Sequence, residues 1–269
     1  MATYLDAILD RHRSAAAADD RDPAALLDAA RACEPPRGFA AAIRATDGLA
    51  VIAEVKRRSP SKGDLAADLD ASSLAATYAA NGASCLSVLT DVEHFGGSVV
   101  DLVVAREASG LPVIRKDFTV CAADVCDARL MGADCVLLIA AALSDDELST
   151  FGALALDLGL DVLVEVHDEA ELDRALVRVV PAAVVGGPEV LVGVNQRDLE
   201  TFRVDQERAV RVAAAIPEHL VRVAESGVRG RDDAVALRAA GYDAVLVGEH
   251  LVTADDPAAA LAALRVGGR

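Results

Sequence analysis

Only three of the 26 basic side chains in this sequence are lysines, and their positions are the first indication of chemistry. Lys56 and Lys116 each close an apolar, strand-like run, whereas Lys62 lies in a loop rich in serine and glycine. An ammonium group shifts its pKa readily when it is buried and so can exchange protons, which a guanidinium cannot do. A charge at the end of an apolar run is costly without a role, so we interpret Lys56 and Lys116 as site residues. For Lys62, a site role and a codon or salt bias explain the sequence equally well.

Carboxylate and amide side chains stand at the same kind of position, the end of an apolar run. They are Glu54, Glu165, Glu225 and Asn195, with Arg197 two residues beyond the last. Alternate residues of a strand share a face, so Glu54 and Lys56 can point into one cavity. Two lysines, three carboxylates and an amide around that cavity would suit acid–base chemistry on an anionic substrate. Salt bridges at a wet rim are the alternative, but they explain polar ends on five separate runs poorly.

A repeated β/α pattern must position these residues. A short run rich in Val, Ile and Leu alternates with a polar loop and an Ala/Leu-rich helical stretch. The eight runs cover residues 50–56, 84–90, 111–116, 133–139, 161–166, 190–195, 220–225 and 243–248. They are continuously apolar, as parallel strands covered on both faces are. The pattern predicts a (β/α)8 TIM barrel, with its chemistry at the C-terminal ends of the strands. A doubly wound open sheet is the rival, but even repeats and the lack of a Gly-x-Gly-x-x-Gly motif weigh against it.

We expect one barrel domain over residues 1–269, with residues 1–48 as an N-terminal helical extension. Leu5, Ile8 and Leu9 form a helical stripe, and Asp22-Pro23 begins a second helix. These helices are too short for a core of their own. We therefore expect them to pack over one mouth of the barrel.

The composition limits the partners and the compartment. A formal charge of −17 argues against nucleic acid or an anionic membrane as the main partner. No apolar run approaches the roughly 18 residues of a membrane span. The N-terminus has no basic region typical of a secretory signal, and the five cysteines contain no Cys-x-x-Cys pair, so we expect a cytoplasmic protein with reduced thiols and no metal site. Few lysines, many acids and no tryptophan also prompt a hypothesis of a high-salt cytoplasm, with genomic base bias as the alternative.

Two glycine-containing turns follow the last two runs. They are Ser226-Gly227 and Gly248-Glu249, in the positions where barrels commonly bind phosphate through backbone N–H groups. Ser59 and Lys62 in the first loop could supply further donors to an anion. A simple turn is the alternative for that loop, because Ser-Pro is common in turns.

Several segments resemble the signature sequences of the indole-3-glycerol-phosphate synthase family. They are Ile52–Gly63, Leu86–Asp91, Phe95–Ser98, Pro112–Phe118, Gly132–Ile139, Asn195–Leu199 and Val223–Gly227, with Pro35–Phe39 in the extension. The first segment is the most specific, because a phosphate-binding barrel in general would not share it. Gln196 and His250 are departures from the family pattern.

The resemblance implies closure, decarboxylation and dehydration of 1-(2-carboxyphenylamino)-1-deoxyribulose 5-phosphate, a small anionic sugar phosphate, to indole-3-glycerol phosphate. No metal or organic cofactor is implied. Lys116 would be the general acid at the substrate carbonyl, and Glu165 would support that step and the positive charge that develops. Lys56 would hold the substrate carboxylate and help in dehydration, with Glu54 as its partner and as a candidate base. A lysine beside carboxylates and another cation can be tuned to release a proton near neutral pH, whereas an arginine cannot.

The remaining site residues follow from the same resemblance. Asn195 and Glu225 would orient substrate hydroxyls, and Ser226 would line the same pocket. Phosphate would be bound by Ser59, Gly227 and Gly248, with Lys62 as a further candidate. Glu249, in the last of these turns, would belong to the substrate-binding residues, and Arg197 would position the loop or neighbouring carboxylates. Phe95 and Phe118 would be apolar walls for the aromatic ring, with ordinary core packing the alternative.

Two other functions remain to be weighed. A different sugar-phosphate enzyme on the same barrel would need a Cys/Asp or Asp/Asp pair at the strand ends, which this sequence lacks there. A non-catalytic binding barrel would have a degraded site, whereas all the expected acids, bases and phosphate donors are present.

We expect a monomer or a weak homodimer.

Overall fold

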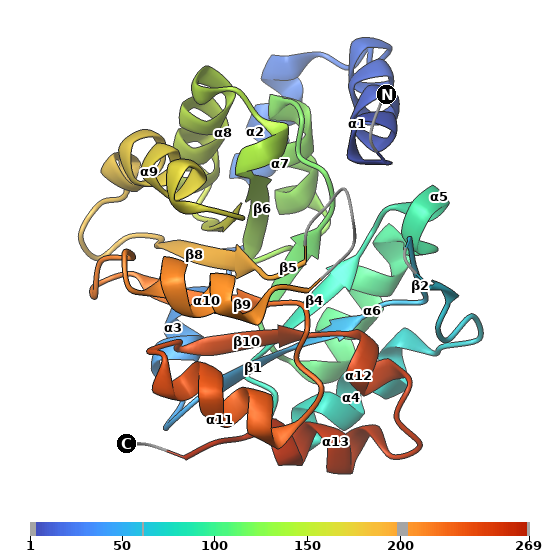
Figure 1. The fold of residues 1–269 in the computed structure, drawn as a ribbon. Coiled ribbons are helices and arrows are strands. Elements are labelled where there is room, and N and C mark those ends of the chain that lie inside the picture. The colour runs from blue at the N-terminus through green and yellow to red at the C-terminus, as the bar shows by residue number, and fades with distance from the viewer. Residues whose placement is uncertain (1–3, 61, 198–203, 268–269) are drawn as a thin grey trace.

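The strands form a closed barrel (Figure 1). The computed structural model describes residues 4–60, 62–197 and 204–267, and within them eight parallel strands close in the order β1-β10-β9-β8-β7-β6-β5-β4. Their bounds are β1 Ala50–Val55, β4 Cys85–Leu89, β5 Val113–Lys116, β6 Cys135–Ile139, β7 Asp161–Val166, β8 Val190–Asn195, β9 Val221–Glu225 and β10 Ala244–Val247. Each lies within one residue or two of a predicted run, so the (β/α)8 prediction is confirmed.

The alternation of side chains along β1 separates two cores. Val51, Ala53 and Val55 belong to the layer between the strands and the surrounding helices. Ala50 and Ile52 belong to a second cluster inside the barrel. Because strand side chains alternate, the next residue in the inward series is Glu54, at the C-terminal mouth. The strand pattern thus delivers a charged side chain to the top of a filled barrel.

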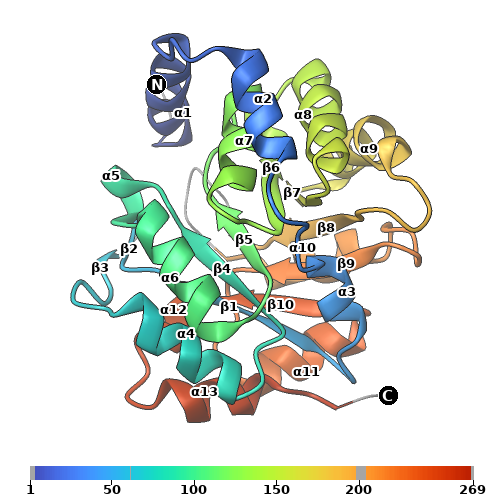
Figure 2. The same cartoon turned by 180° about the vertical axis from the view of Figure 1, so that it is seen from behind.

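Helices surround the barrel on all sides (Figure 2). Those that return the chain between strands are α4 Ala71–Ala80, α6 Val99–Ser109, α7 Ala122–Leu130, α8 Asp145–Asp157, α9 Glu169–Arg178, α10 Gln206–Ala213, α11 Arg231–Ala239 and α13 Pro257–Leu264. Shorter elements at strand ends are α5 Val92–Phe95, α12 Glu249–Val252, the 3-10 turns Ala140–Ala142 and Val180–Ala182, and the hairpin of β2 Arg58–Ser59 with β3 Gly63–Asp64. Ser144 and Glu147 form a capping box at the start of α8, as sequences of this spacing do. Among the described helices, none is long and apolar enough to cross a membrane.

The N-terminal extension folds as three helices, and they do not share one mouth of the barrel. They are α1 Tyr4–Ala17, α2 Pro23–Arg31 and α3 Phe39–Arg44. Only α1 stands at the C-terminal mouth, where it lines the pocket described below. Helix α2 packs against α7 on the outside. Helix α3 closes the opposite end.

Helix α3 reaches the barrel interior through its apolar side chains. Phe39, Ala40 and Ile43 belong to the cluster inside the barrel. The backbone N–H of Ala40 donates to the carboxylate of Asp161, the first residue of β7, at 2.8 Å. The expectation that the whole extension covers one mouth was therefore wrong for α2 and α3, because each buries its apolar stripe against a different part of the barrel.

Candidate functional site

One pocket of about 520 Å³ opens at the C-terminal ends of the strands. The structure brings every predicted site residue to its wall. They are Glu54, Lys56, Ser59, Lys62, Phe95, Lys116, Phe118, Glu165, Asn195, Arg197, Glu225, Ser226, Gly227, Gly248 and Glu249. They come from seven strand ends and loops that are far apart in the sequence. Of the sequence motifs around the pocket, Ser61 and Asp198–Leu199 lie outside the described residues.

A lysine between two glutamates forms the centre of the pocket. The Lys116 Nζ donates to Glu165 Oε2 at 2.9 Å and lies 3.4 Å from Glu225 Oε2. Asn195 Nδ2 donates to Glu165 Oε1 at 3.0 Å, so both oxygens of Glu165 are engaged. Both glutamate side chains are almost fully buried. Low solvent exposure strengthens these interactions and fixes the geometry.

The charges around Lys116 keep it protonated. Burial alone would lower the pKa of Lys116, but its carboxylic neighbours, Glu165 first and then Glu225 and Glu54, raise it above its ordinary value. The sequence argument, in which lysine is tuned to release its proton near neutrality, is therefore not what the structure shows. Lys116 instead enters as a full ammonium, which is the state that a proton donor needs at the start of a reaction.

The pKa values of the two carboxyl groups beside Lys116 are shifted in opposite directions. Burial alone would raise the pKa of Glu165, but the charges of Lys116 and His167 and the hydrogen bond from Asn195 bring it below its ordinary value. Burial and the neighbouring Glu165 raise the pKa of Glu225, only partly offset by Lys116. Two buried carboxylates close to one ammonium do not both ionise easily. The arrangement therefore holds Glu165 as the anion and Glu225 as the neutral acid.

A second lysine–glutamate pair lies on β1 and just beyond it. Lys56 Nζ contacts Glu54 Oε1 at 2.7 Å, as the shared face of the strand predicts. The Ser87 hydroxyl donates to the other oxygen, Glu54 Oε2, at 3.2 Å. A Cβ added at Gly248 would lie 2.2 Å from Glu54 Oε1 and 3.0 Å from Lys56 Nζ. Gly248 therefore makes room for this pair, whatever else its backbone binds.

Gly193 on β8 has the same role for Glu225 and was not singled out from the sequence. A Cβ at this position would lie 2.1 Å from Glu225 Oε1. The available signal was a glycine inside an apolar strand, a position that often marks the close approach of another group. The sequence did not indicate which group approaches Gly193, because Glu225 is on a different strand.

The turn after β9 has an unusual backbone. Ser226 has φ 64° and Gly227 has φ 71°, and the first is the one non-glycine residue with positive φ among the described residues. Such conformations cost energy in ordinary residues and gather at functional sites. The buried Gln196 side chain donates to the Ser226 carbonyl at 2.9 Å and holds the turn in place. The sequence marked Gln196 only as a departure from the family pattern.

The loop after β1 brings an unsatisfied hydroxyl to the pocket. Ser59 is buried, and its Oγ has no hydrogen-bond partner within the described part of the chain. Lys62 at the rim contacts Glu249 Oε1 at 2.5 Å, and Arg197 lies 3.8 Å from the other oxygen of Glu249. Glu249 thus links two cations that an anionic ligand would also attract.

The remaining wall is apolar. Phe95 of α5 and Phe118 after β5 have ring centroids 6.3 Å apart. Tyr4, Leu5 and Ile8 of α1 complete this side of the pocket. The N-terminal helix was expected to cover a mouth, but the sequence did not identify its individual contacts.

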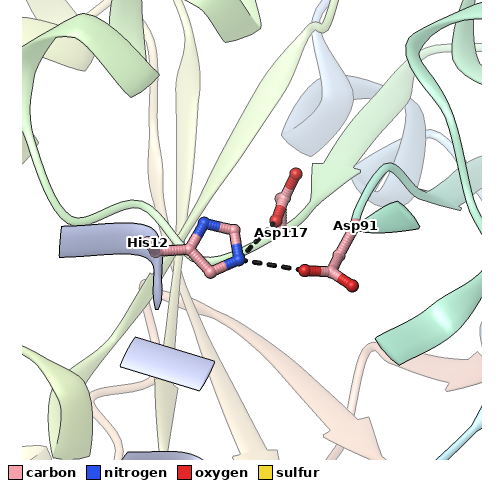
Figure 3. A group of neighbouring side chains, drawn as sticks. All are labelled: His12, Asp91 and Asp117. Carbon is pink, nitrogen blue, oxygen red and sulfur yellow. Dashed lines mark hydrogen bonds and ion pairs between the residues drawn. The ribbon is translucent and has the colours of Figure 1, made fainter. Parts of the chain in front are cut away.

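A histidine of α1 meets two buried aspartates beside this wall (Figure 3). His12 Nε2 lies 3.0 Å from Asp91 Oδ2 and 3.8 Å from Asp117 Oδ1. These three side chains have a donor set that could suit a metal ion. However, the Arg11 guanidinium contacts Asp91 and Arg115 lies 3.1 Å from Asp117, so each carboxylate already has a cation. The charge balance favours a docking contact that seats α1.

The fold alone is common to several barrels of known structure. A crystal structure of 3-hexulose-6-phosphate synthase aligns with a TM-score of 0.58 at 18% identity, covering 80% of this chain and 98% of that chain. A thiamine phosphate pyrophosphorylase from Pyrococcus furiosus aligns with a TM-score of 0.55 at 15% identity, covering 80% and 93%. At such identities the likeness concerns the barrel and not its chemistry.

Sequence comparison is more specific. The family model described as indole-3-glycerol phosphate synthase matches residues 5–264. The indole-3-glycerol phosphate synthase of Streptomyces griseus is 47% identical over 271 residues, covering 99% of this chain and 96% of that protein. Indole-3-glycerol phosphate synthase 1 of Streptomyces coelicolor is 48% identical with the same coverage. The chain therefore belongs to the indole-3-glycerol phosphate synthase family.

Proposed function

We propose that this protein converts 1-(2-carboxyphenylamino)-1-deoxyribulose 5-phosphate to indole-3-glycerol phosphate, with release of carbon dioxide and water. The observation that carries the proposal is the buried ammonium of Lys116, held between Glu165 and Glu225 at the centre of the pocket. Family membership supplies the substrate. The pocket supplies a proton donor and carboxylates at the place where barrel enzymes react.

The reaction requires proton transfers that this arrangement can serve. When the aromatic carbon that carries the carboxylate attacks the ketone, the ketone oxygen becomes a hydroxyl and needs a proton. Loss of carbon dioxide restores the aromatic ring. Departure of the hydroxyl as water then needs a second proton, and loss of the C1 proton forms the indole double bond. Two protons are delivered and one is recovered, so both acids and a base must line the pocket.

We assign the first proton delivery to Lys116, which is protonated and lies in the pocket wall. Glu165, ionised beside it, would stabilise the positive charge on the ring system after attack. Its second oxygen is held by Asn195, which keeps the carboxylate in a fixed orientation. Fixed charges in a site of low solvent exposure stabilise a developing charge without reorganisation.

We assign the Lys56–Glu54 pair to binding of the substrate carboxylate and to the dehydration step. Lys56, held by Glu54 at 2.7 Å, offers a cation on the opposite side of the barrel from β7. Such a cation would bind the carboxylate before it leaves and would then protonate the departing hydroxyl, while Glu54 would take up the proton lost from C1. Glu225 and Asn195 would orient the substrate hydroxyls, with Ser226 beside them.

Binding of the two ends of the substrate follows from the chemistry of the walls. The Ser59 hydroxyl, without a partner in the described chain, and the backbone of the Gly227 and Gly248 turns favour the phosphate. Lys62 would join them by leaving Glu249, which would then pair with Arg197. Phe95 and Phe118 would enclose the aromatic ring.

The partners, the cellular compartment and the oligomeric state are proposals as well. The charge of −17 supports work on small anions through a local cationic pocket, in preference to nucleic acid or membrane partners. The same composition supports a cytoplasmic protein of a high-salt cell. A monomer or weak homodimer is a separate proposal. Activity and folding that do not depend on added salt would contradict the high-salt hypothesis.

The direct test uses the absence of tryptophan, which keeps the protein's own fluorescence low. The purified protein is mixed with the carboxyphenylamino-deoxyribulose phosphate in low-salt buffer and in molar potassium chloride. We expect indole fluorescence to grow with time, and its salt dependence tests the high-salt hypothesis. No fluorescence in either buffer, from protein with a cooperative thermal transition, would favour a non-catalytic barrel that binds a phosphorylated metabolite.

A further inference from the structure

His167 is a buried titratable side chain next to the reacting groups that the proposed mechanism does not use. It lies two residues beyond Glu165, directly after β7, and alternation along the strand turns both side chains toward the same side. His167 is buried and does not line the pocket, whereas Glu165 does. Its place behind Glu165 makes it a candidate for acting through that residue.

Each ring nitrogen of His167 faces a carboxylate. The Nδ1 lies 3.1 Å from Glu171 Oε2 and the Nε2 lies 3.7 Å from Glu165 Oε1. The buried Nε2 has no hydrogen-bond partner within the described residues. The Glu165 carboxylate is the negatively charged group beside it. A lone pair on either nitrogen would face a negative oxygen. The geometry therefore favours the imidazolium, with a proton on both nitrogens.

Glu171 is anchored by the start of α9 and so holds His167 rigidly. The Glu171 carboxylate also accepts the backbone N–H of His167 at 2.8 Å. Its own backbone N–H donates to the Asp168 side chain at 2.8 Å, where Asp168 caps the helix. The imidazole is thus fixed by a carboxylate that the helix terminus keeps in place.

We propose that His167 is a positioning residue for Glu165: its imidazolium, held by Glu171, keeps the Glu165 carboxylate ionised and directed at Lys116. This inference rests on the proposed function and deepens it. The chain Glu171–His167–Glu165–Lys116 then alternates negative and positive groups from α9 through β7 to β5.

The electrostatics agree with this geometry. Burial alone would lower the pKa of His167, but the hydrogen bond with Glu171 and the charges of Glu165, Glu171 and Glu225 raise it above its ordinary value. In turn, the charge of His167 contributes to the lowered pKa of Glu165. The groups that face this histidine are therefore mostly carboxylates, with Lys116 on the far side of Glu165.

Two substitutions separate the two ring nitrogens. In His167→Gln the side-chain NH₂ can reach the place of Nε2, so a neutral donor toward Glu165 is kept. In His167→Asn the NH₂ takes the place of Nδ1, and nothing faces Glu165. We expect kcat of the asparagine variant to fall about tenfold or more and that of the glutamine variant to fall less, with KM within about twofold in both. His219→Gln, at an exposed position outside the pocket, is the matched control and should leave both constants unchanged.

The pH profile distinguishes positioning from simple packing. Without the imidazolium the pKa of Glu165 should rise, so the acidic limb of the kcat profile should move to higher pH in both variants. A purely structural histidine would lower the melting temperature and leave that limb in place. Unchanged kcat and an unchanged limb in both variants would overturn the inference, as would equal losses in both that follow a lower melting temperature.

A measurement without turnover keeps this inference separate from the proposed function. The five histidines can be titrated by proton NMR, and the signal missing in His167→Gln identifies His167. We expect its pKa to lie above the ordinary histidine value and to fall in Glu171→Gln. A His167 that titrates at or below the ordinary value would refute the imidazolium. An inactive wild-type protein would count against the proposed function only.

Discussion

Substitution of Gly193 by alanine is the most direct test of how the pocket is built. The added Cβ would lie 2.1 Å from Glu225 Oε1 and 3.2 Å from Leu163 Cδ1. Since carbon and oxygen atoms repel at such short range, the Glu225 carboxylate must move by about 1 Å. Its Oε2 lies 3.4 Å from Lys116 Nζ before the change, so the movement disrupts the contact between Glu225 and the ammonium.

The expected cost is mainly catalytic. A shift of about 1 Å within a reacting constellation costs on the order of 100-fold in rate, or about 2.7 kcal/mol in activation free energy. Overpacking by one methyl group destabilises a core by about 1–3 kcal/mol, which lowers the melting temperature of a chain of this size by only several degrees. We therefore expect a folded protein with kcat reduced about 100-fold.

Indole fluorescence measures kcat, and circular dichroism measures the melting temperature. A double-mutant cycle with Glu225→Ala supplies the control, because alanine at position 225 removes the carboxylate that the new methyl group meets. In that background Gly193→Ala should cost much less stability, and the two effects should not add. If Gly193→Ala keeps kcat within about twofold of the wild type, Glu225 is not held as the structure describes, and the reasoning is refuted.

Four further perturbations test other parts of the site. Lys116→Met should abolish turnover while substrate affinity, measured by equilibrium titration, stays within about tenfold; near-normal turnover would exclude Lys116 as the acid. Because the pKa of Glu225 is raised, this side chain is protonated at neutral pH and loses its proton on the alkaline side, where a second anion beside Glu165 should lower both stability and activity. Glu225→Gln should therefore stay active near neutrality and show a weaker alkaline decline, and an unchanged alkaline limb would contradict this. Arg11→Ala should loosen α1, raise KM and speed proteolysis of the extension, whereas unchanged proteolysis would argue against the docking contact. Burial would raise the pKa of Asp91, but the hydrogen bonds from His12 and from the His94 backbone and the charge of Arg11 lower it. The ionised Asp91 therefore stabilises the folded protein above the ordinary aspartate pKa, and this stability should be lost as the solution is acidified.

Local sequence patterns predicted most of the barrel. Continuous apolar runs predicted the eight strands, since parallel strands covered on both faces need no polar alternation. The two-residue period of a strand predicted that Glu54 and Lys56 share a face, and they form an ion pair at 2.7 Å. The glycines after helical stretches mark helix ends, as at Gly132 with φ 88°. Family resemblance then named the residues of the pocket.

What the sequence by itself determined is therefore the eight barrel strands and which side chains stand at their ends. The tertiary structure alone decided the distances between ends, because Lys116, Glu165 and Glu225 lie on three strands and only barrel closure sets their separation. That separation decided the sign of the Lys116 pKa shift, since burial and carboxylates act in opposite directions. It also decided why Gly193 must lack a side chain. Local periodicity does not encode contacts between strands, and the chemistry of this pocket depends on those contacts.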